Sequence, residues 1–192
     1  MKREPASHPP QQVRLIGGQW KRSILPVVNH PGVRPTPQRV RETLFNWLGP
    51  DLTGWRCLDA FAGSGALGFE AASRGAASVV MVEQDGTLAQ SLRTSQQRLN
   101  AQQIQIYRED AVRFMLRQPA VSFELILLDP PFDAELWMPS LEAAHPLLVA
   151  DGFIYLEAPE PWPAQRVQEL GLQLYRRSQA GAVHYHLLRS NS

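Results

Sequence analysis

From residue 56 onward, apolar and polar residues follow two alternating periods. Short, almost wholly apolar runs predict buried strands at Arg56–Ala60, Ser78–Glu83, Ile104–Tyr107, Glu124–Asp129 and Phe153–Glu157. Helical spacing lies between them, at Ala66–Arg74, Thr87–Asn100, Ala111–Arg117 and Leu136–Leu148. Strands that are apolar on both faces are typical of a parallel sheet that helices cover on both sides.

The end of the chain has the period of half-buried strands instead. Leu172–Arg177 and Val183–Leu188 alternate apolar and polar residues, and Ala180-Gly181-Ala182 between them predicts a hairpin. His184 and His186 alternate along the second strand, where we expect them on a solvated face. A mostly parallel seven-stranded sheet that ends in an antiparallel hairpin is the outline of the Class I methyltransferase fold, a Rossmann-like α/β fold.

The segment before this core is patterned differently. Residues 1–12 are rich in Pro, Gln, Ser and His without periodicity, which predicts a disordered leader. Apolar runs on both sides of Gly17-Gly18 predict a small strand or hairpin over residues 13–28. Thr36 is a suitable N-cap for a helix from Pro37 to Leu48. We therefore expect a single domain over residues 13–192, with an N-terminal extension (13–55) and a core (56–192).

Composition narrows the class of protein. The chain has 192 residues, which suits one α/β domain, and no apolar run is long enough to span a bilayer or to form a signal peptide. The lone cysteine, Cys57, lies in an apolar run and can form no internal disulfide, which fits the cytoplasm. Residues 1–56 hold nine Lys/Arg against three Asp/Glu, whereas the remainder is acidic. This asymmetry indicates contact with a polyanion through one edge of the molecule, although a solvated tail explains it equally well.

A glycine-rich turn follows the first strand of the core. Asp59 ends that strand, and Gly63 and Gly65 precede a helix whose first N–H groups suit an anionic group. Glu83 closes the next strand, where its carboxylate can accept hydrogen bonds from ribose hydroxyls. These features predict a nucleotide-like cofactor at the turn.

The identity of that cofactor has two candidates. Gly63-x-Gly65-x-x-Gly68 followed by Glu83 matches the dinucleotide fingerprint, so a nicotinamide-dependent oxidoreductase is one alternative. Asp59 counts against it, because a carboxylate would be unfavourable beside a pyrophosphate. The D-x-x-x-G-x-G spacing is typical of sites for S-adenosylmethionine, where the acid lies near the cationic amino acid end. The sequence therefore favours a methyltransferase.

The segment Asp129-Pro130-Pro131-Phe132 follows the next-to-last parallel strand directly. At the carboxyl end of a central strand it should face the cofactor. An exocyclic amine is a poor nucleophile, and the Asp129 carboxylate and the Pro130 carbonyl can each accept one of its hydrogens and hold it in line with the methyl group. Phe132 offers a ring on which a base can stack. A rigid surface turn is the alternative explanation.

Two further observations concern ligands. Asp110-Ala111 follows the strand Ile104–Tyr107, where the acid can accept the amino hydrogen of adenine or cap the next helix. None of the five His residues forms a set with the spacing of metal ligands, and methyl transfer requires no metal.

Three segments together resemble the bacterial RsmD family of small-subunit ribosomal RNA guanine-N2 methyltransferases. They are Arg34–Leu48, Asp59–Gly68 and Asp129–Phe132, and the resemblance extends from about Val13 to Arg189. Lys21-Arg22-Ser23 is a departure, since the family more often has Arg-Gly-Arg there.

The resemblance implies roles for three groups of residues. The cofactor would be bound by Thr36, Asp59, Gly63, Ser64, Gly65, Glu83, Asp110 and Ala111. The guanine would be held by Asp129, Pro130 and Phe132. RNA phosphates would be contacted by Arg14, Lys21, Arg22, Arg34, Arg39 and Arg41. A surface salt bridge, for instance with Glu42, is the alternative for the last two arginines.

The activity that the resemblance implies is methylation of N2 of a guanine in small-subunit (16S) ribosomal RNA by a monomer, during assembly of the subunit. A partly assembled subunit would be the substrate. An adenine-N6 methyltransferase acting on DNA or RNA would use the same loop, so that alternative stays open. An RNA-binding protein without activity is a third possibility, against which the intact Asp129 argues.

Overall fold

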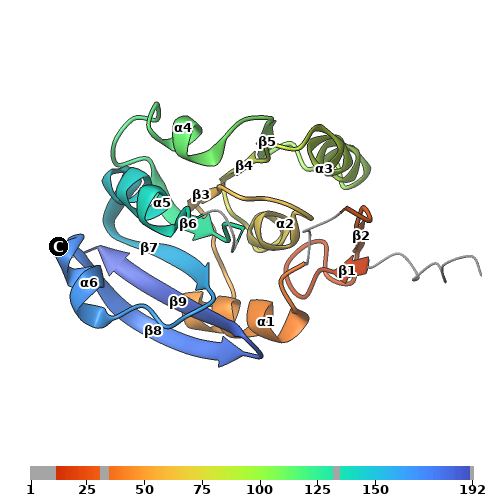
Figure 1. Cartoon of the computed structure of the whole chain (residues 1–192). Helices are drawn as coiled ribbons and strands as arrows, with labels where there is room; N and C mark the ends of the chain where they lie inside the picture. The colour runs from red at the N-terminus through yellow and green to blue at the C-terminus, as the bar shows by residue number, and fades with distance from the viewer. Residues whose placement is uncertain (1–11, 31–34, 132–134, 191–192) are drawn as a thin grey trace, which may run out of the picture.

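A computed structural model describes residues 12–30, 35–131 and 135–190. Its main sheet has seven strands in the order β5-β4-β3-β6-β7-β9-β8 (Figure 1). These are β3 (Arg56–Asp59), β4 (Ser78–Val82), β5 (Ile104–Tyr107), β6 (Phe123–Leu128), β7 (Leu148–Ala158), β8 (Leu172–Ala180) and β9 (Val183–Ser190). Strands β3 to β7 are parallel, whereas β9 is antiparallel to both β7 and β8. The predicted α/β class, with a mostly parallel sheet that ends in a hairpin, is confirmed.

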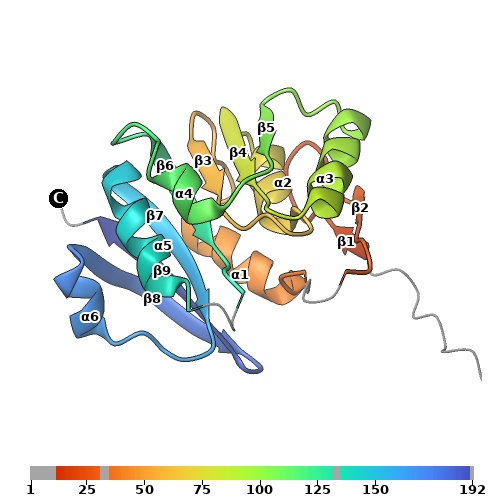
Figure 2. The same cartoon turned by 45° about the horizontal axis from the view of Figure 1, so that its top comes forward.

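Helices cover both faces of this sheet (Figure 2). One buried cluster includes residues of α1 (Gln38–Leu48), α2 (Ala66–Ser73) and α3 (Gly86–Arg98). The other includes residues of α4 (Ala111–Met115), α5 (Trp137–Ala144) and α6 (Ala164–Glu169). Successive residues of a strand point to opposite faces, and Leu127 and Leu128 of β6 accordingly belong to different clusters. The nearly continuous apolar runs of the sequence arise from this double burial.

The N-terminal hairpin packs onto the same core. Strands β1 (Gln12–Arg14) and β2 (Ile24–Pro26) are antiparallel, as predicted, and Gln12 belongs to β1 rather than to a leader. The N–H groups of Ile16 and Gly17 each donate to the Glu70 carboxylate of α2 at 2.8 Å. Ser73, one turn later on α2, donates through its hydroxyl to the Gly17 carbonyl at 2.6 Å. The hairpin is therefore bonded directly to the helix that follows the glycine turn.

The predicted start of α1 is wrong by one residue. Pro37, not Thr36, occupies the N-cap position, and no side chain caps the helix. The Thr36 hydroxyl is bonded to the Glu157 carboxylate instead, and the Thr36 carbonyl accepts a hydrogen bond from Arg41 at 3.1 Å. Thr36 is thus committed to tertiary contacts, which local propensity does not reveal.

Other predictions fail at the boundaries of elements. The stretch Leu136–Leu148 is not one helix, because α5 ends at Ala144 and a short 3₁₀ turn, His145–Leu147, contains Pro146. Strand β7 begins at Leu148, five residues before the predicted start. The six-residue helix α6 was not predicted. Short helices carry little periodic signal and depend on tertiary packing.

His186 does not lie on a solvated face. It is fully buried opposite Leu156, and its Nε2 accepts a hydrogen bond from the Trp162 N–H at 3.1 Å. Strand β9 lies between β7 and β8, so neither of its edges is open to solvent. The face on which His186 lies is covered by α6 and the loop before it. Cys57 is buried as expected, and burial raises the pKa of its thiol. Among the residues that the structure describes, no helix is long and apolar enough to cross a membrane.

Candidate active site

Four acidic residues lie at the carboxyl ends of four neighbouring strands. Asp59 ends β3, Glu83 follows β4, Asp129 follows β6, and Glu157 is the next-to-last residue of β7. Strand β4 lies on one side of β3 and β6 on the other, so the strand order reverses between β3 and β6. Ligands of open α/β sheets bind in the crevice at such a reversal. The structure therefore brings the predicted cofactor and amine-binding acids to one edge of the sheet.

The glycine turn closes tightly against this edge. Gly65 has φ of +79°, and a Cβ there would lie 2.6 Å from the Phe69 ring. Gly68 allows a similarly close approach, because its N–H donates to the Asp59 carboxylate at 2.9 Å and a Cβ would come within 2.9 Å of the same oxygen. Both positions require glycine for steric reasons.

Asp59 and Glu83 are each bonded to a glycine of the turn, Asp59 to Gly68 and Glu83 to Gly63. Asp59 is only 2% exposed, and burial, together with the nearby Glu83, raises its pKa to about 7. Glu83 accepts the Gly63 N–H with one oxygen and the Asp85 N–H with the other, each at 2.8 Å. A carboxylate has about four acceptor sites, so Glu83 retains capacity for ligand hydroxyls. A cationic group beside Asp59 would favour its ionised form.

Asp110 occupies the N-cap of α4, one of the two roles considered for it. Its carboxylate accepts the Arg113 N–H at 2.8 Å, and Ala111 is the buried first residue of the helix. The loop before it is bonded to the Glu83 region, since the Glu109 N–H donates to the Glu83 carbonyl at 3.2 Å. The predicted adenine and ribose contacts therefore come from adjacent segments.

In the second pair of acids, Glu157 is 4% exposed and Asp129 is half-buried. Burial raises the pKa of Asp129 well above its ordinary value, and the negative charges of Glu157 and Asp59 raise it further. Burial also raises the pKa of Glu157, against the opposing effect of hydrogen bonds from Tyr155 and Thr36. The Tyr155 hydroxyl donates to Glu157 at 2.8 Å from a fully buried position. Two carboxylates in this position can accept hydrogen bonds from the donor groups of a ligand.

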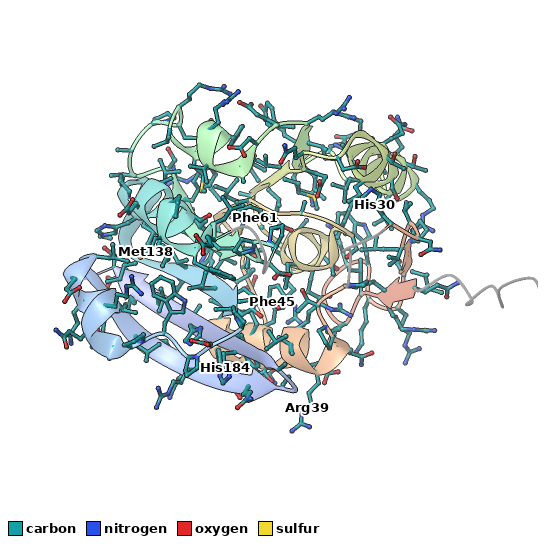
Figure 3. The ribbon with its side chains drawn as sticks, in the orientation of Figure 1. His30, Arg39, Phe45, Phe61, Met138 and His184 are labelled. Atoms are coloured by element: carbon teal, nitrogen blue, oxygen red, sulfur yellow. The ribbon has the colours of Figure 1, made fainter. Side chains whose placement is uncertain are left out.

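Two predicted site residues, Phe132 and Arg34, lie outside the described residues. Pro130 is buried directly after Asp129, as expected for a carbonyl fixed at the edge of the crevice. Phe61, in the loop between Asp59 and Gly63, lies near the centre of the molecule between α5 and α2 (Figure 3). It packs partly against the second buried cluster, so one aromatic ring is present in the loop of the glycine turn.

The hairpin and the start of α1 enclose a basic groove, defined here by Arg14, Lys21, Arg22 and Gln38. It consists of two adjoining cavities of about 460 and about 230 Å³ that share Arg14 and Gln38. Thr36 lines the larger cavity, and its hydroxyl is bonded to Glu157 of the crevice. Three predicted RNA-contacting residues, Arg14, Lys21 and Arg22, thus line these adjoining cavities.

Arg41 differs from a surface arginine, which both of the explanations considered for it assume. It is 2% exposed, its guanidinium donates to the carbonyls of Thr36 and Arg14 at 3.1 Å, and it lies 3.7 Å from the Glu70 carboxylate. These buried partners give Arg41 a structural role, and it also lines the larger cavity beside Arg14 and Gln38. Arg39, two residues earlier, projects from α1 away from the rest of the molecule (Figure 3).

Sequence reasoning missed two acids of this region. Glu157 lies at the carboxyl end of a strand, as Asp59 and Asp129 do, and applying the strand-end rule to β7 would have named it. Glu70 gave no signal, because an acid on a helix is ordinarily on the surface. Its fully buried position follows from contacts with residues more than fifty positions away, in the hairpin.

Sheet order, helices on both faces and the glycine turn after β3 define a Class I S-adenosylmethionine-dependent methyltransferase fold. The family model "Conserved hypothetical protein 95" matches residues 13–189. Ribosomal RNA small subunit methyltransferase D of Escherichia coli is 40% identical over 186 residues, covering 89% of this chain and 91% of the relative. The chain belongs to this family, the RsmD family.

Further relatives extend the comparison. The Haemophilus influenzae protein of the same name is 40% identical over 179 residues, covering 86% of this chain and 92% of its own. The solved structure of yhhF from Escherichia coli has a TM-score of 0.81 at 39% identity, covering 95% of this chain and 99% of that one. The similarity therefore extends over hairpin, crevice and terminal strands together.

Proposed function

We propose that the protein transfers the methyl group of S-adenosylmethionine to the exocyclic N2 amine of a guanine in small-subunit ribosomal RNA. The observation that carries the proposal is the position of Asp129-Pro130 at the end of β6, across the strand reversal from the glycine turn. The names of the relatives, which act on small-subunit ribosomal RNA, support the substrate class.

The residues of the turn fit the cofactor. Asp59 would face its cationic amino acid end, with Gly63, Ser64 and Gly65 around it. Glu83 would accept hydrogen bonds from the ribose hydroxyls with the acceptor capacity that its two backbone donors leave. Asp110 and Ala111 would meet the adenine, and Thr36 would cover the pocket. When bound, S-adenosylmethionine supplies a methyl group on a cationic sulfur.

The chemistry of the amine falls to Asp129 and Pro130. Each would accept one N–H of the amine, so that the nitrogen lone pair is directed at the methyl carbon. The Asp129 carboxylate would stabilise the positive charge that develops on the nitrogen as it gains the methyl group and the sulfur keeps the electron pair of the broken S–C bond. The surplus proton then leaves to Asp129 or water. Phe132 would stack on the base.

The basic groove would hold the RNA backbone. Arg14, Lys21 and Arg22 line it, and Arg39 projects from the neighbouring helix. Contacts between such cations and phosphates would release counterions, so binding would weaken steeply with salt. The extension over residues 13–55 therefore serves as the RNA-contacting part and residues 56–192 as the catalytic part of one domain. The corresponding substrate is a partly assembled small ribosomal subunit, on which the enzyme would act as a monomer.

The proposal is tested in cells that lack the protein. Nucleosides of their small-subunit ribosomal RNA, quantified by mass spectrometry, should lack one N2-methylguanosine. A plasmid carrying the wild-type gene should restore it, and one carrying Asp129→Ala should not. Unchanged N2-methylguanosine in the deletion strain would contradict the proposal. A change confined to N6-methyladenosine would assign the same site to an adenine amine.

A further inference from the structure

Asp129 and Glu157 are neighbours across two parallel strands. Leu127 pairs with Tyr155 and Leu128 with Leu156, so Asp129 and Glu157 occupy the next register position of β6 and β7. Neighbouring strands lie about 4.8 Å apart, and paired residues of parallel strands point to the same face. The two carboxylates therefore form a pair at the edge of the crevice, and only one of them is needed for the amine.

Glu157 is fixed by donors but not saturated by them. It is 4% exposed, and it is bonded to the hydroxyls of Tyr155 and Thr36. A carboxylate has about four acceptor sites, so about two stay open. Both donors stabilise the ionised form and fix its direction. Because so little of Glu157 is exposed to solvent, binding of a ligand that donates a hydrogen bond to its carboxylate would be favoured. Binding of a ligand that places an acceptor there would cost free energy.

The edge of a guanine presents the donors that such a pair requires. Guanine carries N1–H beside the N2 amine, two donors in a row, whereas adenine carries an N6 amine beside an N1 that only accepts. With Asp129 on the amine, the neighbouring carboxylate would meet a donor in guanine and a lone pair in adenine. Sites built to hydrogen-bond a donor reject an analogue without it by roughly 10⁴–10⁵-fold in favourable cases.

We propose that Glu157 accepts the N1–H of the target guanine beside Asp129, and thereby selects guanine over adenine. This inference rests on the proposed function and assigns its base specificity to one residue. Tyr155 and Thr36 act as positioning residues that hold the Glu157 carboxylate. Thr36 belongs to the segment that lines the basic groove, so it connects the RNA-contacting groove with the base-reading carboxylate.

The test uses 2-aminopurine, which retains the N2 amine but lacks N1–H. Small subunits are reconstituted with ribosomal RNA that carries guanine or 2-aminopurine at the methylated position. Methyl transfer from S-adenosylmethionine is measured with wild type and Glu157→Gln, whose amide can donate to N1 of the analogue. With wild type, the rate of methyl transfer to guanine should exceed the rate to 2-aminopurine by about 100-fold or more. Glu157→Gln should lower this ratio of rates by about 10-fold or more.

A purely structural role would slow both substrates alike and leave the ratio unchanged, which would overturn the inference. Unchanged affinity for S-adenosylhomocysteine would show that the variant is folded. If Glu157→Gln does not fold, Tyr155→Phe replaces it. That variant removes one of the two donors that position the Glu157 carboxylate, and it should lower the guanine-to-2-aminopurine ratio by about 3-fold. Wild type that leaves guanine unmodified would instead contradict the proposed function.

Discussion

The carboxylate of Glu70 should hold the N-terminal hairpin on the core of the domain. This fully buried group accepts three hydrogen bonds, from the N–H groups of Ile16 and Gly17 and from Nε of Arg74, and the guanidinium of Arg41 forms an ion pair with it at 3.7 Å. We consider the substitution Glu70→Gln, which preserves volume. Its single amide oxygen can satisfy at most two donors, and its NH₂ group would face the others.

The magnitude follows from these contacts. Hydrogen bonds to charged groups are worth about 1.5–3 kcal/mol each, and breaking a buried ion pair by removing one partner costs about 3–5 kcal/mol. The terms overlap, so we expect a loss of about 3–5 kcal/mol in the free energy of unfolding. For a chain of this length, the melting temperature should fall by roughly 6–20 °C.

Three measurements check this expectation. Urea unfolding gives the loss of stability, and hydrogen exchange should show faster exchange at the amides of Ile16 and Gly17. RNA affinity should fall at a temperature where the variant is still folded, while cofactor affinity stays within about twofold, because Glu70 faces the hairpin and not the crevice. Glu169→Gln is the matched control, since that exposed acid has one hydrogen bond, from Gln165 at 3.3 Å. A loss below about 1 kcal/mol, as expected for the control, would refute the role of Glu70.

Four further predictions concern the site. Asp129→Ala should lower kcat by about 10²–10⁴-fold and leave cofactor affinity nearly unchanged; undiminished turnover in single-turnover assays would remove it from the reaction. Glu83→Ala should weaken cofactor binding by about 10–100-fold in calorimetry, because the variant loses a charged acceptor and its hydrogen bond to the glycine turn. An affinity equal to that of wild type would exclude the ribose contact. Asp59, whose pKa is raised to about 7, becomes protonated as the pH falls below that value. Cofactor affinity should therefore drop by up to about tenfold per pH unit in the acid range, and a flat profile, as expected for Asp59→Asn, would contradict its contact with the cationic end. Arg22 has φ of +73°, which glycine adopts more readily, so Arg22→Gly should stabilise the protein by about 0.5–1 kcal/mol. The same variant should reduce the salt dependence of RNA binding by about one phosphate contact. Destabilisation would show that the Arg22 side chain packs against the protein rather than binding RNA.

Much of the core could be predicted because its signals are local. The apolar run of β6 and the glycines before α2 specify strand and turn within a few residues. Once the strand order is known, the acids at the strand ends converge on one edge of the sheet. Local patterns therefore located Asp59 and Asp129 and predicted the outline of the sheet.

The predictions that failed depend on contacts between distant segments. Arg41 has the pattern of a surface arginine, and only the buried Glu70 of α2 makes it a structural group. His186 alternates like a solvated residue, but its strand lies between two others. Thr36 has the chemistry of an N-cap, yet it bonds to Glu157 more than a hundred residues later. Neither propensity nor periodicity includes such tertiary partners.

The most direct test of the account is methyl transfer in vitro. Small ribosomal subunits from cells that lack the protein are incubated with the pure enzyme and S-adenosylmethionine carrying a tritiated methyl group, and the labelled nucleosides are identified. The account predicts label in N2-methylguanosine with wild type and its loss with Asp129→Ala. Label in another nucleoside, or no label despite saturating cofactor, would contradict it.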